Sequence, residues 1–159
     1  MMRRTNWLIA VAVAAMVTAC APGDDTFGVP GDRYPENARE IAGAAEWANA
    51  ETVAVDLSEF AFSPRTLVFK MGQPYVLRLK NSGSQSHRFV ARGFFRAIAT
   101  RSLMYADAEA SFPLLEAIAL APNETKTLYF VPVTRGDYHS SCDMPLHAMF
   151  GMAGRILIE

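Results

Sequence analysis

The sequence predicts an all-β fold, an antiparallel sandwich or barrel, in the part of the chain that follows residue 50. Short segments of alternating apolar and polar residues recur from there to the last residue, and Gly, Pro and Asn turns separate them. No internal repeat or low-complexity tract interrupts this pattern. Many short strands at such a density are typical of sandwiches and barrels.

The first twenty residues have the pattern of a targeting segment. Two arginines precede an apolar run at residues 7–16, which is shorter than the ~20 residues that a membrane-spanning helix needs. Residues 17–20 resemble the lipobox of bacterial lipoproteins, which predicts a signal peptide over residues 1–19 and a lipid on Cys20. An ordinary signal peptide with an incidental cysteine is the alternative. We therefore expect an exported protein on the periplasmic or outer-surface side, anchored to a bacterial membrane.

Residues 20–50 are expected to form the lipid-bearing tether and one short helix. Residues 21–34 are rich in Pro, Gly and Asp, as in flexible linkers. Between residues 35 and 50 apolar side chains recur at helical spacing, and Pro35 suits a first helical turn.

The β-domain is expected over residues 51–159. Its expected strands are residues 52–57, 60–64, 66–70, 75–80, 86–91, 124–131, 136–142 and 155–159. Residues 92–123 are apolar without clear alternation. We predict that they form a partly helical insertion, with a helical turn or two and then a strand at 116–121.

The composition excludes several classes of function. The chain has 15 basic and 16 acidic side chains without a basic run, so no nucleic-acid partner is expected. No Ser-His-Asp set, carboxylate pair or phosphate-binding loop is present, so we expect no enzyme. The apolar fraction of 51% fits a globular domain, expected to be a monomer.

Four side chains predict a metal site. Cys142, His147 and Met152 follow one another at the spacing Cys-x4-His-x4-Met, and His87 ends a turn far upstream. Two imidazoles and a thiolate with a weak axial thioether form a blue-copper electron-transfer site. Each residue alone is more often a structural one, but together, before a final strand, they favour copper. If Cys20 carries a lipid, Cys142 has no partner for an internal disulfide.

Strand alternation predicts which side chains point inward. Tyr138, Ser140 and Cys142 share one face of their strand, and His139 lies on the other. We therefore expect Cys142 to face the interior and His139 to be exposed or structural.

The chain resembles the cupredoxins. The matching segments are 60–64, 81–87, 136–138, 151–152 and 154–156, together with Cys142 and His147. The resemblance covers about residues 51–159 and implies a Greek-key β-sandwich with one type 1 copper. It implies His87, Cys142 and His147 as equatorial ligands and Met152 as the axial ligand.

Two residues depart from the family pattern. Arg88 follows His87, where many cupredoxins have an Asn that ties the ligand loops together, and Ser140 replaces a frequent aromatic residue. Another donor, Ser86 or Ser141, is then expected to hold the thiolate.

The leading functional hypothesis is a membrane-tethered carrier of single electrons between redox partners. The partners are expected to dock on an apolar collar around His147, formed by Met144, Pro145, Leu146, Met149 and Phe150. The alternative is a copper-handling protein, a chaperone or scavenger, in which Met144, Met149 and Met152 offer Cu(I) a labile site.

Overall fold

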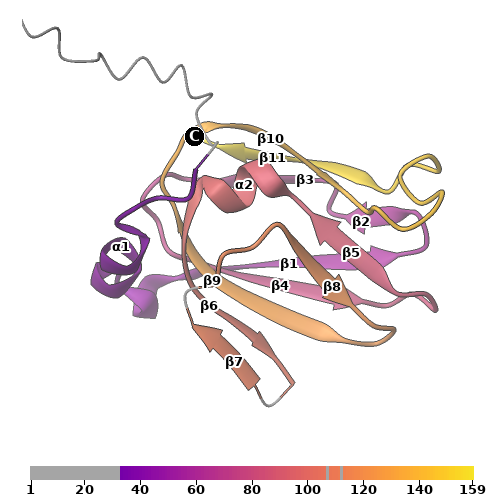
Figure 1. Cartoon of the computed structure of the whole chain (residues 1–159), viewed down its shortest axis with the longest axis horizontal. Coiled ribbons are helices and arrows are strands. Elements are labelled where there is room, and N and C mark those ends of the chain that lie inside the picture. Colours follow the sequence, from indigo (N-terminus) through magenta and orange to yellow (C-terminus); the bar gives the residue numbers. More distant parts are fainter. Residues whose placement is uncertain (1–32, 107, 112) are drawn as a thin grey trace, which may run out of the picture.

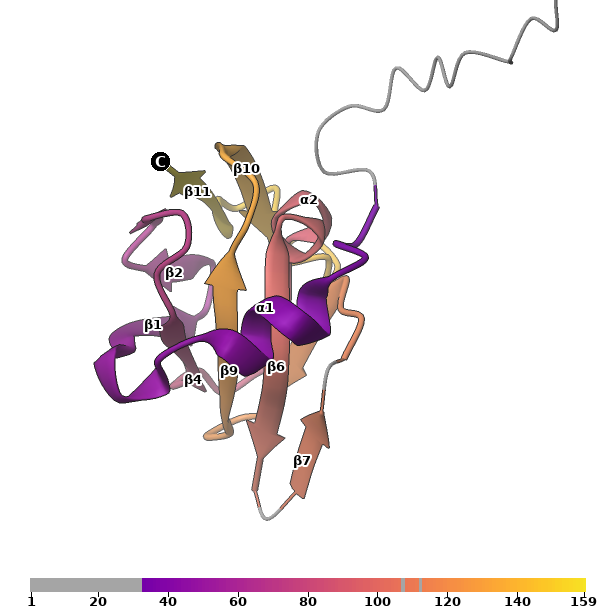
Figure 2. The same ribbon diagram turned by 90° about the vertical axis from the view of Figure 1, so that its left-hand side faces the viewer.

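Two β-sheets pack face to face, and one helix lies on the outside of the larger sheet (Figures 1 and 2). The computed structural model describes residues 33–106, 108–111 and 113–159. The predicted signal peptide, Cys20 and most of the predicted tether lie outside these described residues. Within them, no helix is both long and apolar enough to cross a bilayer.

The larger sheet has six strands in the order β2, β1, β4, β9, β6, β7, and the smaller has five in the order β3, β11, β10, β5, β8. The strands of the larger sheet are β1 (Glu51–Ser58), β2 (Ala61–Ser63), β4 (Tyr75–Asn81), β6 (Ile98–Tyr105), β7 (Ala108–Ser111) and β9 (Thr125–Pro132). Those of the smaller sheet are β3 (Thr66–Phe69), β5 (His87–Val90), β8 (Ala117–Leu120), β10 (Gly136–Ser141) and β11 (Ala153–Ile158). The predicted two-sheet sandwich is confirmed.

Two strand pairs are parallel, so the expectation of a purely antiparallel sandwich was wrong for them. Strand β1 pairs with β4 in parallel, and β3 pairs with β11 in parallel. Parallel neighbours need a crossover connection. Between β1 and β4 the chain makes this crossover by passing through β3 in the opposite sheet.

The predicted helix near the start of the described chain is present but shorter than expected. Helix α1 (Ala38–Ala44) ends where Ala45 takes an extended backbone, and a 3₁₀ helix η1 (Trp47–Asn49) follows. Helix α1 crosses the outer face of β6 and β9 (Figure 2) and buries Ala42 against them.

The segment 92–123 is only partly the helical insertion that was predicted. Helix α2 (Arg92–Arg96) and strand β8 match the prediction, but β6 and β7 were not predicted, and β6 lies inside the larger sheet. Strand β6 has the core on one face and α1 on the other, and a strand covered on both faces shows no alternation. A register shift between Thr100 and Ser102 leaves Arg101 at a bulge, which further disrupts the alternation of apolar and polar residues along the strand.

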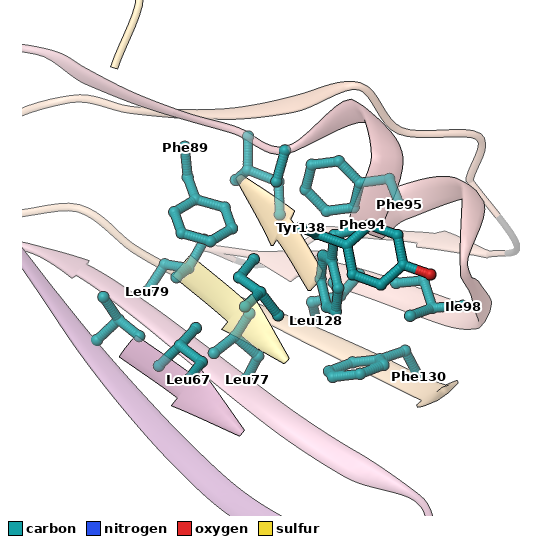
Figure 3. Close-up of a cluster of buried hydrophobic side chains, with 14 of the residues drawn as sticks. Leu67, Leu77, Leu79, Phe89, Phe94, Phe95, Ile98, Leu128, Phe130 and Tyr138 are labelled. Atoms are coloured by element: carbon teal, nitrogen blue, oxygen red, sulfur yellow. The ribbon is translucent and has the colours of Figure 1, made fainter. Parts of the chain in front are cut away.

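The core between the sheets is rich in aromatic side chains (Figure 3). Phe69, Phe94 and Phe130 are fully buried and contact one another, with ring centroids 5.1 to 5.7 Å apart. Burying each such ring contributes roughly 1.5–3 kcal/mol. The same buried cluster includes Cys142 and Met152, so the predicted metal site rests directly on the rigid core.

Candidate metal centre

The predicted site residues meet at one end of the sandwich. His87 is the first residue of β5, Cys142 follows the last residue of β10, and Met152 precedes the first residue of β11. His147 lies in the loop that connects β10 to β11. This loop is drawn in orange to yellow at the right of Figure 1, beside the turn from β1 to β2. Strands β5 and β10 are antiparallel neighbours through Val90 and Ser141, which brings His87 next to Cys142.

The predicted alternation along β10 is confirmed. Tyr138, Ser140 and Cys142 are buried, and His139 is exposed on the opposite face. Cys142 therefore points into the sandwich, and His139 points away from the other two histidines.

Three potential donor atoms converge. The Nδ1 atoms of His87 and His147 are 3.2 Å apart, and Cys142 Sγ is 3.5 Å from His147 Nδ1. Ligand atoms of these three residues all lie within 4.8 Å of one another. Two ring nitrogens this close cannot both carry a proton without repulsion, so at least one presents a lone pair. With Cys142 deprotonated and both ring nitrogens free of protons, one thiolate and two imidazole lone pairs lie within reach of a single ion, and such a set suits a borderline or soft metal ion.

Burial keeps the upstream histidine neutral. His87 and Cys142 are 0% exposed, whereas His147 is half-buried. Burial lowers the pKa of His87, the neighbouring His147 lowers it further, and Glu59 opposes this in part. A histidine must be neutral to bind a metal, so the environment prepares His87 for ligation.

The thiol sulfur receives a hydrogen bond from the backbone rather than from a serine. The N–H of Arg88 donates to Cys142 Sγ over 3.5 Å. Ser86 and Ser141, which are both among the described residues, make no such bond, so the expectation of a serine donor was wrong. A backbone donor was missed because it depends on strand geometry and not on residue type.

Hydrogen bonds within the ligand loop fix its shape. The N–H of Cys142 donates to the carbonyl of Met152, and the N–H of Met152 donates to the carbonyl of His147, each over 3.0 Å. Gly151 has φ +104°, a conformation that side-chain-bearing residues rarely adopt. The loop thus returns Met152, fully buried, to the base of the site.

The loop before His87 is held by a buried amide. The Asn81 side chain donates to the carbonyls of Gln85 and Leu120 over 2.8 and 3.1 Å, and it accepts from the N–H of Gly83 over 2.9 Å. These bonds tie the loop to β8, next to the start of β5.

Two residues of the turn from β1 to β2 also belong to the site, and the sequence did not predict them. The Phe60 ring stands perpendicular to the His147 ring, with centroids 5.2 Å apart. Glu59 Oε1 lies 3.9 Å from His87 Nε2. Hydrogen bonds lower the pKa of Glu59, chiefly the one from the Gln85 backbone. Their role depends on tertiary folding of the turn, for which the sequence carries no local signal.

The donor set fits one type 1 copper. It comprises a thiolate, two imidazoles and a buried thioether, provided by Cys142, His87, His147 and Met152. Soft sulfur donors suit Cu(I), and imidazole suits both oxidation states.

Solved structures with the same fold include copper enzymes. A multicopper oxidase from Pseudomonas thermotolerans matches with a TM-score of 0.58 and 18% identity, over 72% of this chain and 31% of that one. A copper nitrite reductase from Nitrosomonas europaea matches with a TM-score of 0.53 and 13% identity, over 74% of this chain and 52% of that one. The chain thus spans about a third of the oxidase and about half of the reductase.

Shorter proteins match over nearly their whole length. Dithionite-reduced auracyanin from the photosynthetic bacterium Roseiflexus castenholzii has a TM-score of 0.48 and 19% identity, over 69% of this chain and 98% of that one. No curated protein matches the chain.

The family comparison agrees with the fold and with the donor set. The cupredoxin-like domain matches residues 8–158, nearly the whole chain. This protein is a member of the cupredoxin-like domain family.

Proposed function

We propose that this protein carries single electrons through one copper ion bound by His87, Cys142, His147 and Met152. The observation that supports this most strongly is the convergence of two imidazole nitrogens and a buried thiol sulfur within 4.8 Å. A bound copper ion supplies one-electron chemistry by alternating between Cu(I) and Cu(II).

The chain's contribution is a site that changes little between the two states. Three of the four proposed ligands, His87, Cys142 and Met152, are fully buried. They lie at the start of β5, just after β10 and just before β11, so the sheet fixes the backbone at each of them. The Arg88 N–H donates to the sulfur from a strand that cannot shift without breaking its ladder. Hydrogen bonds to a ligand atom, such as this one, orient the ligand and tune the reduction potential of the metal.

Electrons would enter and leave through His147. Its imidazole is the least buried of the four proposed ligands, and it lies among the apolar collar residues. Leu146, Met149 and Phe150 are 58, 76 and 59% exposed. Phe60 packs on both the His147 ring and Phe150, and so extends the collar. An exposed apolar patch of this type suits transient docking of a redox protein.

Catalysis is not part of the proposal. The copper enzymes that share the fold are longer, with this chain spanning 31% of the oxidase and 52% of the reductase. Among the described residues, His139 is exposed on the far face of β10 and does not join the donor cluster.

We further propose that the protein is exported and tethered to a membrane by a lipid on Cys20, which precedes the described residues. The support is the pattern of residues 1–20. In a bacterial host, Cys20→Ser should move the protein from the membrane fraction to the soluble fraction. Retention of the variant in the membrane fraction would contradict the lipid anchor.

Repeated redox cycling tests the carrier proposal against copper handling. The chain from residue 21, loaded with copper, is reduced with ascorbate and reoxidised with ferricyanide in the presence of a Cu(I) chelator. A carrier keeps its copper over many cycles, whereas a copper-handling protein releases it to the chelator. Met149→Leu is a matched variant, because Met149 is highly exposed and should not affect retention in a carrier. Faster release from this variant would favour a thioether-rich Cu(I) site.

A further inference from the structure

We propose that Glu59 is a positioning residue for His87: its carboxylate accepts a hydrogen bond from the N–H of His87 Nε2, so that Nδ1 presents its lone pair to the metal. This inference rests on the proposed copper site. It concerns the turn from β1 to β2, which supplies none of the proposed ligands.

The first observation is a buried ring nitrogen without a hydrogen-bond partner. His87 Nε2 is buried, and it is the one buried side-chain nitrogen or oxygen in the described part of the chain without a hydrogen-bond partner. Buried polar atoms nearly always have such a partner. The carboxylate oxygen Glu59 Oε1, at 3.9 Å, is slightly beyond hydrogen-bond length. A small rotation of the ring or one bridging water closes this gap.

The second observation is that this oxygen is held in place. Glu59 Oε1 accepts hydrogen bonds from the backbone N–H of Ser84 over 2.6 Å and of Gln85 over 2.9 Å, and from the Ser84 hydroxyl over 3.2 Å. These donors belong to the loop that leads directly into His87. The carboxylate is therefore bonded to the segment that carries His87, and this keeps the distance between the carboxylate and the imidazole nearly constant.

The third observation is the space left for the carboxylate. A Cβ atom on Gly83 would lie 2.7 Å from each carboxylate oxygen of Glu59. No side chain fits at position 83 unless the Glu59 carboxylate moves. Since that carboxylate is the far end of a flexible side chain, Gly83→Ala should displace it while leaving the loop folded.

The two ring nitrogens of His87 thus have different neighbours. His87 Nδ1 faces His147 Nδ1, inside the cluster of proposed ligand atoms, and His87 Nε2 faces the Glu59 carboxylate. A carboxylate on the second nitrogen of a ligand histidine fixes its tautomer and ring orientation and raises its basicity. The negative charge also favours the more highly charged oxidation state of a bound metal, and so lowers the reduction potential.

The tautomer can be measured without copper. Long-range ¹H–¹⁵N correlation spectra of the metal-free protein should show His87 as the Nε2–H tautomer alone. Glu59→Ala and Gly83→Ala should each give a mixture of tautomers, whereas Glu59→Gln should keep the Nε2–H form because its amide oxygen still accepts.

Asp56→Ala is the matched control. The Asp56 carboxylate accepts a hydrogen bond from the Ser82 hydroxyl, so it holds the same loop from strand β1, just before the turn that carries Glu59. This variant should leave the His87 tautomer unchanged. An unchanged tautomer in Glu59→Ala, or the same change in Asp56→Ala, would show that Glu59 only supports the loop, and the proposal would be wrong.

Copper binding gives a second readout. Glu59→Ala should bind copper about tenfold more weakly or worse, and Glu59→Gln should have a higher reduction potential than the parent. An unchanged affinity in the first variant or an unchanged potential in the second would overturn the proposal. If the parent protein binds no copper, the proposed function fails, while the tautomer measurement still decides the role of Glu59.

Discussion

The guanidinium of Arg88 and the carboxylate of Asp143 form an ion pair between the two ligand segments. Arg88 follows His87, and Asp143 follows Cys142, so the pair joins the residues next to two proposed ligands. Many cupredoxins tie these segments with an Asn at the position of Arg88. Here the side chain does so through an ion pair, and the backbone N–H of the same residue donates to the sulfur.

Arg88→Ala should loosen this connection without abolishing the copper spectrum. The sulfur keeps its donor, because that donor is the backbone N–H. Both side chains are partly exposed, at 43 and 38%, and such pairs contribute about 0.2–1 kcal/mol. A double-mutant cycle with Asp143→Ala, measured by urea unfolding of the metal-free protein, gives the coupling energy. Added salt should reduce it; a coupling unaffected by salt would contradict a simple ion pair.

Gly151→Ala should destabilise the ligand loop. A Cβ at this position meets no atom closer than 4.0 Å, so the cost comes from the backbone, whose φ is +104°. Left-handed backbone costs other residues about 1–2 kcal/mol. Urea unfolding of the metal-free protein measures the effect. The control is Gly43→Ala in helix α1, where nothing lies within 4 Å and alanine should stabilise by up to about 1 kcal/mol. Equal effects of the two changes would refute the backbone explanation.

Substitution of Met152 should shift the reduction potential in both directions. Met152→Gln offers a harder oxygen donor that favours Cu(II), so the potential should fall. Met152→Leu removes the donor while keeping the apolar volume in the core, so the potential should rise. Voltammetry measures both values, and the exposed Met149→Leu is the control. If all three variants kept the parent potential, Met152 would not be the axial ligand.

The ion pair between Arg155 on β11 and Asp137 on β10 should make stability depend on pH in the acid range. Arg155 lowers the pKa of the Asp137 carboxyl below its usual 3.8. The contribution is therefore complete above the unfolded-state pKa and is lost as the pH falls through the lowered folded-state value. Arg155→Met should be less stable than the parent at pH 7, and the difference should shrink as the carboxyl is protonated. Urea midpoints across this range provide the measurement, and a difference that stays constant down to pH 2 would contradict this account. Asp137→Asn should show the same trend.

Most of the candidate metal site could be proposed from the sequence because three of its residues are close together in the chain. The spacing of Cys142, His147 and Met152 places three donors in one loop, and the alternation of β10 gives the direction of Cys142. His87 could be placed because a turn precedes its strand. The three loop residues needed only residue types and short spacings, whereas the roles of the four ligands, with His87 far upstream, were implied by the resemblance to the cupredoxins.

Features that depend on long-range contacts could not be predicted. Strand β6 is covered on both faces and carries a bulge, so its sequence does not alternate between apolar and polar residues. The roles of Glu59 and Phe60 depend on the turn from β1 to β2 folding against two other segments. The donor to the sulfur is a backbone N–H, which every residue except proline possesses.

The most direct test of the copper site is the visible absorption and EPR spectrum of the protein after addition of Cu(II). We expect an intense thiolate-to-copper band with narrow hyperfine splitting, and its loss in Cys142→Ala. A colourless protein, or a Cu(II) signal that is the same with and without the Cys142 sulfur, would contradict the proposed type 1 site.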